Sequence, residues 1–315
     1  MHRRTFLRVG VAAAVAGLPA AARAASGHPK AAPLAPAPFR LDYAPHFGMF
    51  EQHAGRDPVA QLEFMAAEGF RALEDNGMRE RPVAEQERIG RTLGRLGMRM
   101  GVFVGHRIDW RTGELPALPS GDPAGRDAFL AQLRESVEVA KRVNARWMTV
   151  VPGMLDPRLD LEYQTAHVVD ALRRGAEVLA PHDLVMVLEP LNTRVDHPGV
   201  FLTRAAQAYQ LCRAVGSPAC KVLFDVYHQQ ITEGQLIANL DRCWDEVAYV
   251  QAGDVPGRRE PGTGEINYGN VFRHLHARGY RGVVGMEHGN ARPGRAGERA
   301  VIEAYRRADT FAAAG

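Results

Sequence analysis

The chain has 315 residues with a formal net charge of +3, from 39 Lys and Arg against 36 Asp and Glu, and it contains three cysteines. Several of the positive charges lie in the first residues, so the remainder is close to neutral and lacks the basic stripe that nucleic-acid binding requires. The cysteines stand at no metal-finger spacing, which argues against a zinc finger and leaves buried thiols or a disulfide open.

Residues 1–24 have the pattern of an export signal. Arg3 and Arg4 precede the apolar run GVAAAVAGL, and the segment ends in the small-residue pattern AlaArgAla. This run is shorter than the roughly 20 residues of a membrane-spanning helix. We therefore expect twin-arginine export to the periplasm or the exterior, and no membrane span after cleavage; an uncleaved anchor is the alternative. Residues 25–38, rich in Ala and Pro, are expected to be a linker.

Four strand–helix repeats are predicted in the first half of the remaining chain. Asp57 and Pro58 have the pattern of an N-cap followed by a first-turn proline. The long connection 106–121 is a candidate lid or pocket wall. The expected strands are 39–50, 69–74, 98–106 and 145–153, and the expected helices are 57–67, 82–96, 122–144 and 159–180.

Four further apolar runs follow, and each ends near a residue that can bind a divalent metal. They read VMVLEP with Glu189, CKVLFDVYH with Asp225, VAYVQAGD with Gln251 and GVVGMEHG with Glu287. Apolar runs without alternating polar residues are typical of parallel strands buried on both faces. The segments between them have apolar residues at helical spacing and are expected to be helices, over residues 200–216, 233–244 and 267–278. Eight strand–helix repeats predict an α/β fold, a (β/α)₈ TIM barrel, as a single domain over residues 39–315.

The four strand-end residues form a candidate metal site. In a parallel barrel the C-terminal ends of the strands meet at one mouth, so these side chains are expected to face a common point. One carboxylate at a strand end is a weak signal, because it often only caps the next helix. Three carboxylates placed directly after buried runs, however, need a compensating cation. An oxygen-rich set with one amide favours Mg²⁺ or Mn²⁺, and Zn²⁺ or Co²⁺ stay open.

Other polar residues near the strand ends are candidates for substrate binding. His228 lies three residues after Asp225, and Arg258 lies in the loop after Gln251. Both suit a polyoxygenated or carboxylate substrate, since Arg offers bidentate geometry; the alternatives are a surface histidine and a solvated loop charge. Two more candidates rest on strand-end position alone: Glu74 and His106.

The blocks LEPLN, FDVYHQQ, VQAGDVPGRREPGTGEINYGNVF and GYRGVVGMEHG resemble the xylose-isomerase-like barrel superfamily, and most closely its hydroxypyruvate isomerase branch. The resemblance is specific over about the last third of the chain and extends only to strand–helix order elsewhere. It implies that the four strand-end residues bind the metal, that Glu189 and Glu287 are the acid–base pair, and that His228 and Arg258 contact substrate. Related sugar epimerases often carry a histidine where Gln251 stands.

Such a site suits proton transfer beside a carbonyl group. A metal chelated by a substrate's carbonyl and neighbouring hydroxyl acidifies the C–H between them and stabilises an enediolate, while one carboxylate removes the proton and a second returns it. We therefore expect a metal-dependent isomerase that interconverts hydroxypyruvate and tartronate semialdehyde, or a similar small hydroxy-carbonyl compound.

Two alternatives stay open, an exported sugar epimerase, isomerase or keto-sugar lyase of the same superfamily and a non-catalytic carbohydrate-binding barrel. Retention of both Glu189 and Glu287 argues against the second. A DNA-repair endonuclease is disfavoured, since that branch resembles a multi-zinc site with many more strand-end histidines and the chain lacks a basic face. Homologues of this fold often pair up, so a homo-oligomer also stays open.

Overall fold

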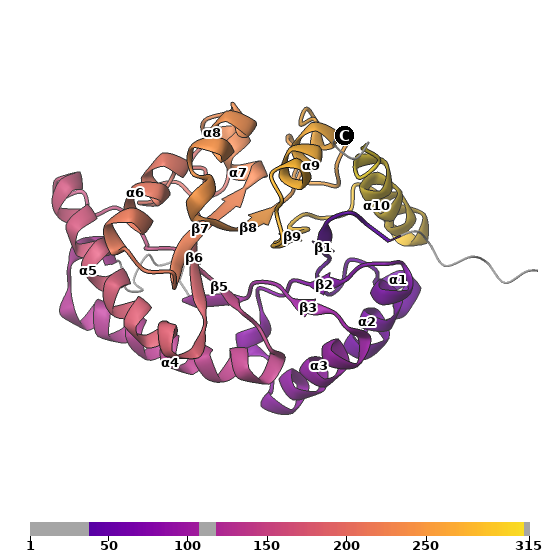
Figure 1. Ribbon diagram of the computed structural model, residues 1–315, viewed down its shortest axis with the longest axis horizontal. Coiled ribbons are helices and arrows are strands. Elements are labelled where there is room, and N and C mark those ends of the chain that lie inside the picture. Colours follow the sequence, from indigo (N-terminus) through magenta and orange to yellow (C-terminus); the bar gives the residue numbers. More distant parts are fainter. Residues whose placement is uncertain (1–37, 107–117, 312–315) are drawn as a thin grey trace, which may run out of the picture. The chain divides into compact units, whose positions relative to one another are not determined.

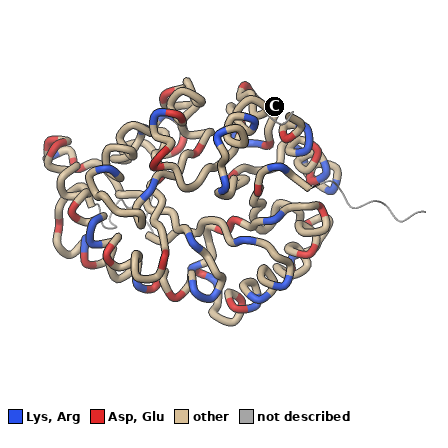
Figure 2. Tube along the Cα trace, viewed as in Figure 1, with Lys and Arg blue, Asp and Glu red and all other residues tan. Residues whose placement is uncertain are grey.

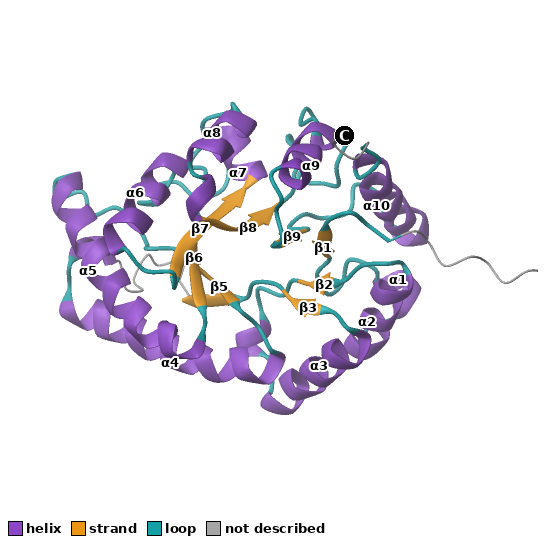
Figure 3. Ribbon diagram, in the orientation of Figure 1, coloured by secondary structure: helices purple, strands orange, loops and turns teal. Residues whose placement is uncertain are grey.

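The computed structural model describes residues 38–106 and 118–311. The expected signal, nearly all of the expected linker and most of the candidate lid therefore lie outside the described residues. Figure 3 shows the helices as an outer ring around the strands, which form the inner layer. The strands are β1 (Asp42–Ala44), β2 (Ala72–Leu73), β3 (Arg99–Met100), β4 (Val104–His106), β5 (Trp147–Val150), β6 (Val185–Leu188), β7 (Cys220–Asp225), β8 (Val247–Gln251) and β9 (Val283–Gly285).

All strand pairs in these ranges are parallel. Seven strands follow the order β1-β9-β8-β7-β6-β5-β4, and β2 pairs with β3 (Figure 1). Between β1 and β2 the barrel closes through a parallel bridge from His46 to Glu74. The Glu74 amide also donates to the carbonyl of Pro45 at 3.0 Å. The predicted parallel barrel is therefore observed.

The third predicted strand, over residues 98–106, is interrupted. Its first part pairs with β2 and its second part with β5, so it is divided into β3 and β4. Backbone hydrogen bonds continue across the gap, from the Gly101 amide to the Leu73 carbonyl at 2.7 Å and from the Thr149 amide to the Phe103 carbonyl at 2.8 Å. A side chain at Gly101 would meet the Tyr249 hydroxyl at 2.3 Å, so this narrow part of the barrel requires glycine.

The helices follow the strands in the predicted order. Asp57 caps α2, accepting from the Ala60 amide at 3.2 Å, and Asp122 caps α4, accepting from the Ala124 amide at 3.1 Å. Two helices, α1 and α7, were not predicted, and α10 is the helix of the eighth predicted strand–helix repeat. The helices are α1 (Glu51–Ala54), α2 (Pro58–Ala67), α3 (Val83–Leu96), α4 (Pro123–Val143), α5 (Leu161–Leu179), α6 (Ala205–Val215), α7 (Val226–Thr232), α8 (Leu236–Arg242), α9 (Tyr268–Ala277) and α10 (Gly294–Ala308).

The core has two layers because successive strand residues point to opposite faces. In β6, Val185 and Val187 belong to an inner cluster with Trp147 and Tyr249, whereas Met186 and Leu188 pack in the larger cluster between strands and helices. All four β6 residues are buried, as the continuous apolar run predicts. The three cysteines are free and buried.

The first and last parts of the described chain are neighbours. The Asp309 carboxylate accepts from the Arg40 amide at 2.7 Å and from the Tyr43 hydroxyl at 2.9 Å. Glu298 of α10 accepts from the backbone amide of His53 at 2.9 Å, and Figure 1 shows α10 beside α1. The last helix therefore holds the first strand and the first helix in place.

Charged residues of both signs are interspersed along the outer helices (Figure 2). None of the helices in residues 38–106 and 118–311 combines the length and apolar character needed to cross a membrane.

Candidate functional site

The four predicted metal ligands end neighbouring strands at one mouth of the barrel. Glu189 directly follows β6, and Asp225 and Gln251 are the last residues of β7 and β8. The strand register places Asp225 beside Gln251, and Gln251 beside Gly285, two residues before Glu287. Parallel pairing thus brings the four residues together, as the sequence pattern predicts.

Asp225 both caps a helix and faces the site. Its Oδ1 accepts from the backbone amides of Tyr227 at 2.7 Å and His228 at 3.4 Å, at the N-terminus of α7. Its Oδ2 accepts from Nη2 of Arg258 at 2.9 Å. The capping interpretation of this carboxylate is therefore confirmed for Oδ1, and Oδ2 is left to face the other strand-end residues.

Arg258 lies between two of the carboxylates. Its Nη2 donates to Asp225 Oδ2 and to Glu287 Oε2, both at 2.9 Å, and its guanidinium lies 4.7 Å from the ring centre of Tyr227. The buried Nε has no hydrogen-bond partner among the residues that the structure describes. One end of the guanidinium thus occupies a position that attracts positive charge, and Nε remains a donor for a bound oxygen.

The loop that carries Arg258 is built around Asp254, which sequence analysis missed. Asp254 is fully buried. Its two carboxylate oxygens accept from four backbone amides, those of Val255, Gly262, Gly264 and Ile266, at 2.8–3.0 Å. Its carbonyl accepts from the amide of Arg258, which has a left-handed backbone with φ of 51°. An Asp in front of a Pro- and Gly-rich segment is the signal that could have identified it.

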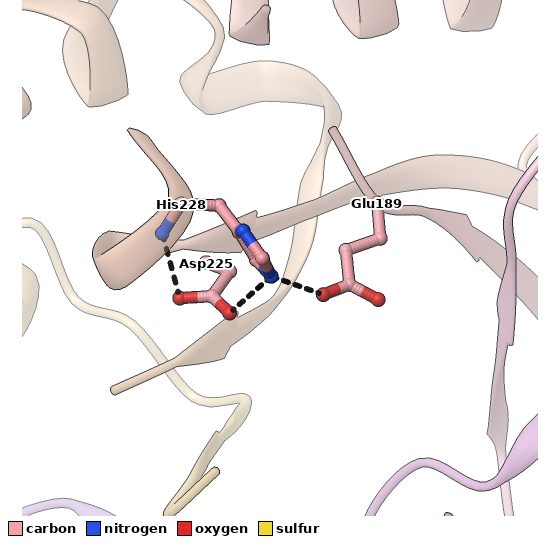
Figure 4. A group of neighbouring side chains, drawn as sticks. All are labelled: Glu189, Asp225 and His228. Carbon is pink, nitrogen blue, oxygen red and sulfur yellow. Dashed lines mark hydrogen bonds and ion pairs between the residues drawn. The ribbon is translucent and has the colours of Figure 1, made fainter. Parts of the chain in front are cut away.

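His228 faces the carboxylates with its Nε2 atom (Figure 4). This atom lies 3.7 Å from Glu189 Oε1 and 3.6 Å from Asp225 Oδ2, and the three residues could together hold a metal ion. However, Nδ1 accepts from the backbone amide of Asn192 at 3.2 Å and lies 2.8 Å from its Nδ2. The neutral ring therefore carries its proton on Nε2, so His228 is a donor at the site and has no lone pair for a metal.

Asn192 fixes this arrangement from the loop after Glu189. Its Oδ1 accepts from the amides of Val195 at 2.9 Å and Asp196 at 3.3 Å, so its Nδ2 must face the histidine. Burial lowers the pKa of His228 well below its usual value, and the charge of Arg258 lowers it further. Asn192 belongs to the LEPLN block but was not identified as a functional residue.

The carboxylates repel one another in a buried space. Burial raises the pKa of Glu189 well above its usual value, and the charges of Glu287 and Asp225 raise it further. The pKa of Asp225 and of Glu287 is also raised by burial, against the opposing charge of Arg258. A divalent cation would offset this burial and repulsion, since it favours the ionised form of every carboxylate near it.

Gln251 supplies a further sign that a cation fits. Its Nε2 donates to Glu74 Oε1 at 2.9 Å, whereas its Oε1 is buried and has no hydrogen-bond partner within the described ranges. Buried carbonyl oxygens are rarely left unpaired in proteins, and an amide oxygen beside carboxylates is a typical ligand for Mg²⁺ or Mn²⁺. The donor set therefore fits an oxygen-preferring divalent metal.

Glu74 and Asn76 reach the site from the end of β2. The Glu74 carboxylate accepts from Tyr249 and Gln251 and is buried, and burial raises its pKa well above the usual value. Asn76, which sequence analysis missed, donates to Glu287 Oε1 at 2.9 Å, and its own Oδ1 is a buried acceptor with no partner among the described residues. Its position two residues after Glu74, in a polar cluster at a strand end, is the signal that was available.

His106 lies at the end of β4 and packs its ring edge-on against Phe129 of α4, with ring centres 4.9 Å apart. This contact is on the helix side of the strand. His288, next to Glu287, points to α10, where its Nε2 lies 3.0 Å from the Tyr305 hydroxyl. Burial lowers its pKa to about 3.

Comparisons with known proteins agree with this architecture. The model of a family described as xylose isomerase-like TIM barrel matches residues 62–308. A 2-oxo-tetronate isomerase of Cupriavidus necator is 34% identical over 243 residues, covering 76% of this chain and 89% of that protein. The hydroxypyruvate isomerase of Escherichia coli K12 is 33% identical over 182 residues, covering 57% and 69%. The structure of a family 2 AP endonuclease from Brucella melitensis is similar, with a TM-score of 0.70 and 26% identity, covering 82% of this chain and 96% of that one.

Proposed function

Because the chain belongs to the xylose isomerase-like TIM barrel family, we propose that it is a metal-dependent isomerase of small hydroxy-carbonyl acids. Its substrates are hydroxypyruvate and tartronate semialdehyde, or close analogues that carry a carboxylate beside the hydroxy-carbonyl pair. Relatives named as hydroxypyruvate isomerase and 2-oxo-tetronate isomerase support this substrate class.

One observation carries the proposal: three residues beside the carboxylates at the mouth each have an unpaired polar atom. These atoms are the acceptor Oε1 of Gln251, the donor Nε of Arg258 and the acceptor Oδ1 of Asn76, all buried and without partners among the described residues. Unpaired buried polar atoms are costly unless a ligand completes them. A cation and an oxygen-rich substrate together would supply the missing partners.

The metal would be held by Glu189, Asp225, Gln251 and Glu287. When bound, it would act as a Lewis acid that stabilises negative charge on the substrate's oxygens. His228 would donate from Nε2 to a substrate oxygen, and Arg258 would donate from Nε to the carboxylate or to a neighbouring oxygen. These contacts would hold the carbonyl and hydroxyl groups on one side, facing the carboxylates.

Glu189 and Glu287 would carry the proton transfer. One removes a proton from the hydroxyl-bearing carbon, which forms an enediolate, and the other delivers a proton to the former carbonyl carbon. The proton of the hydroxyl group passes to the former carbonyl oxygen, so the hydroxyl and carbonyl groups exchange places. Their environments differ: Glu287 accepts from Asn76 and Arg258, whereas the ring nitrogen of His228 lies 3.7 Å from Glu189. Two donors stabilise the ionised form, so Glu287 is better suited to begin as the base and Glu189 to deliver the proton.

The test is proton exchange followed by NMR in D₂O. Metal-loaded protein is incubated with hydroxypyruvate, with 2-oxo-tetronate and then with a panel of ketoses and keto-sugars; a sample stripped of metal by EDTA is the control. Metal-dependent deuterium incorporation into either acid, with conversion, is the expected result. Exchange in a sugar alone would favour a sugar epimerase of the same superfamily. No exchange in any compound would contradict the proposed isomerase activity.

We also propose that residues 1–24 direct export and that the barrel works in the periplasm or outside the cell. The twin arginines and the short apolar run support this. Cell fractionation with mass determination of the purified chain tests it: a cytoplasmic protein of full length would contradict the proposal.

A further inference from the structure

Inside the barrel, below the carboxylates, three buried side chains form a hydrogen-bonded chain. The Tyr249 hydroxyl donates to Glu74 Oε2 at 2.8 Å, and Gln251 Nε2 donates to Glu74 Oε1 at 2.9 Å. Tyr249 is fully buried, and Gln251 and Glu74 are 1% and 2% exposed. The neighbouring strand makes room for them, because a Cβ atom at Gly285 would lie 1.8 Å from Glu74 Oε2. This part of the barrel is therefore shaped around the Glu74 carboxylate.

The orientation of the Gln251 amide decides whether it can bind a cation. A glutamine amide has nearly the same shape in its two flipped orientations, but one presents oxygen and the other presents an NH₂ group. Here both Glu74 oxygens accept hydrogen bonds, so the carboxylate selects the orientation in which NH₂ points toward it. The oxygen then points the other way, where it is buried and unpaired among the described residues.

We propose that Glu74 is a positioning residue that fixes the flip of Gln251, so that Oε1 rather than Nε2 faces the metal. Tyr249 supports it by holding the second carboxylate oxygen. The inference rests on the proposed metal site. In it, Glu74 contacts the metal ligand Gln251 and does not contact the metal itself. A flipped amide would remove one ligand and direct two N–H donors at the cation. Residues that orient metal ligands in this way typically contribute 10- to 100-fold to metal affinity.

The experiment measures Mn²⁺ binding by calorimetry on the whole protein after metal removal. Four proteins form a cycle: wild type, Glu74→Gln, Gln251→Ala and the double variant. The isosteric Glu74→Gln change offers Gln251 a donor as well as an acceptor, so both flips become available. We expect it to raise the Kd for Mn²⁺ by about 10- to 100-fold, and to have no further effect when Gln251 is already Ala.

Each outcome of the cycle separates this inference from the proposed function. A wild type that binds no Mn²⁺ would overturn both. A wild type that binds Mn²⁺ with a Glu74→Gln variant of equal affinity would overturn only the role of Glu74. The role of Glu74 would also be overturned if Glu74→Gln weakened Mn²⁺ binding equally in wild type and in Gln251→Ala. Such a result would indicate a packing defect that does not act through Gln251.

A measurement on the unmutated protein covers the case in which Glu74→Gln does not fold. In protein with isotope-labelled glutamine side chains, the Gln251 signals are assigned by their loss in Gln251→Ala. We expect Mg²⁺ to shift the Gln251 carboxamide carbon while its NH₂ protons stay protected from exchange by the bond to Glu74. An unshifted carbon in protein that binds Mg²⁺, or NH₂ protons that exchange freely, would contradict the proposal.

Discussion

Glu189 and Glu287 carry the same functional group in different environments. Glu287 is half-buried and its two oxygens accept from Asn76 and Arg258, whereas Glu189 is buried, with the nearest ring nitrogen of His228 at 3.7 Å. The pKa of both is raised by burial, and that of Glu189 is raised well above the usual range. Two carboxylates in unequal surroundings are the arrangement that a proton-transfer pair requires.

We expect Glu189→Gln and Glu287→Gln each to reduce kcat by about 10²- to 10⁴-fold, because an amide neither accepts nor delivers the proton. Turnover of hydroxypyruvate in the presence of metal is the measurement, with circular dichroism to verify folding. Near-normal rates in either folded variant would remove that residue from the acid–base pair.

Glu189→Gln should stabilise the metal-free protein at high pH. Because the pKa of Glu189 is raised in the folded state, the folded chain holds a proton that the unfolded chain releases between the usual value of 4.5 and the raised one. The free energy of unfolding of the wild type therefore falls as pH rises through this window. We expect the variant to be more stable by on the order of 1 kcal/mol at pH 8, with a smaller difference at pH 5. Urea unfolding in EDTA measures this; a variant that is less stable at both values contradicts it.

Arg258→Ala should raise KM for an anionic substrate about tenfold or more, because a buried charge-assisted donor is lost. Arg259→Ala is the matched control, since Arg259 is the next residue and is exposed. Initial rates over a range of hydroxypyruvate concentrations distinguish the two variants. Equal KM values for both would place Arg258 outside the substrate site.

At the scale of elements, the loop between β8 and α9 delivers Arg258. Four backbone amides converge on the buried Asp254 carboxylate, which fixes a segment that has no regular secondary structure. A side chain at Gly264 would meet the Val255 carbonyl at 2.0 Å, so the loop is closely packed against itself. The guanidinium is therefore held by a rigid loop, which favours a fixed orientation.

Asp254→Asn should destabilise the protein by about 2–4 kcal/mol, because an amide loses part of the acceptor capacity and turns a donor toward buried N–H groups. Asp245→Asn, at an exposed carboxylate 3.5 Å from Arg213, should cost less than about 1 kcal/mol. Urea unfolding compares them. If both substitutions cost the same, the loop does not depend on Asp254.

The sequence predicted elements better than side-chain partners. Long buried runs such as VMVL predicted β6, and parallel pairing then placed Asp225 beside Gln251. The interruption between β3 and β4 depends on which neighbour each backbone group meets, and no residue pattern specifies this. Asn76 and Asn192 were missed for the same reason, since their partners are 211 and 36 residues away in the chain. Position at a strand end is visible in one sequence, whereas the direction of an amide is not.

At the scale of the whole molecule, the proposed ligands come from four consecutive strands, β6 to β9. A cation bound there would directly connect the ends of these four strands. Binding to the folded state alone contributes RT ln(1 + [L]/Kd), about 2.7 kcal/mol at 100 times Kd.

We therefore expect saturating Mn²⁺ to raise the Tm of EDTA-treated protein by about 5–10 °C, given roughly 2–4 °C for each kcal/mol in a domain of this size. Calorimetric scans with and without metal measure the change, and Gln251→Ala should show a smaller rise. An unchanged Tm at a concentration that restores activity would argue against binding at these strand ends.

The contacts of Asp309 with Arg40 and Tyr43 make the start and finish of the barrel adjacent. The fold requires the circular order of its strands. It does not require that the chain ends lie between these particular strands. A gene in which these ends were joined by a short linker and reopened at an exposed turn on the face opposite the mouth would encode the same ring of contacts. The segment 189–287 would then occupy a different position in the linear sequence, while its strand ends kept the same neighbours.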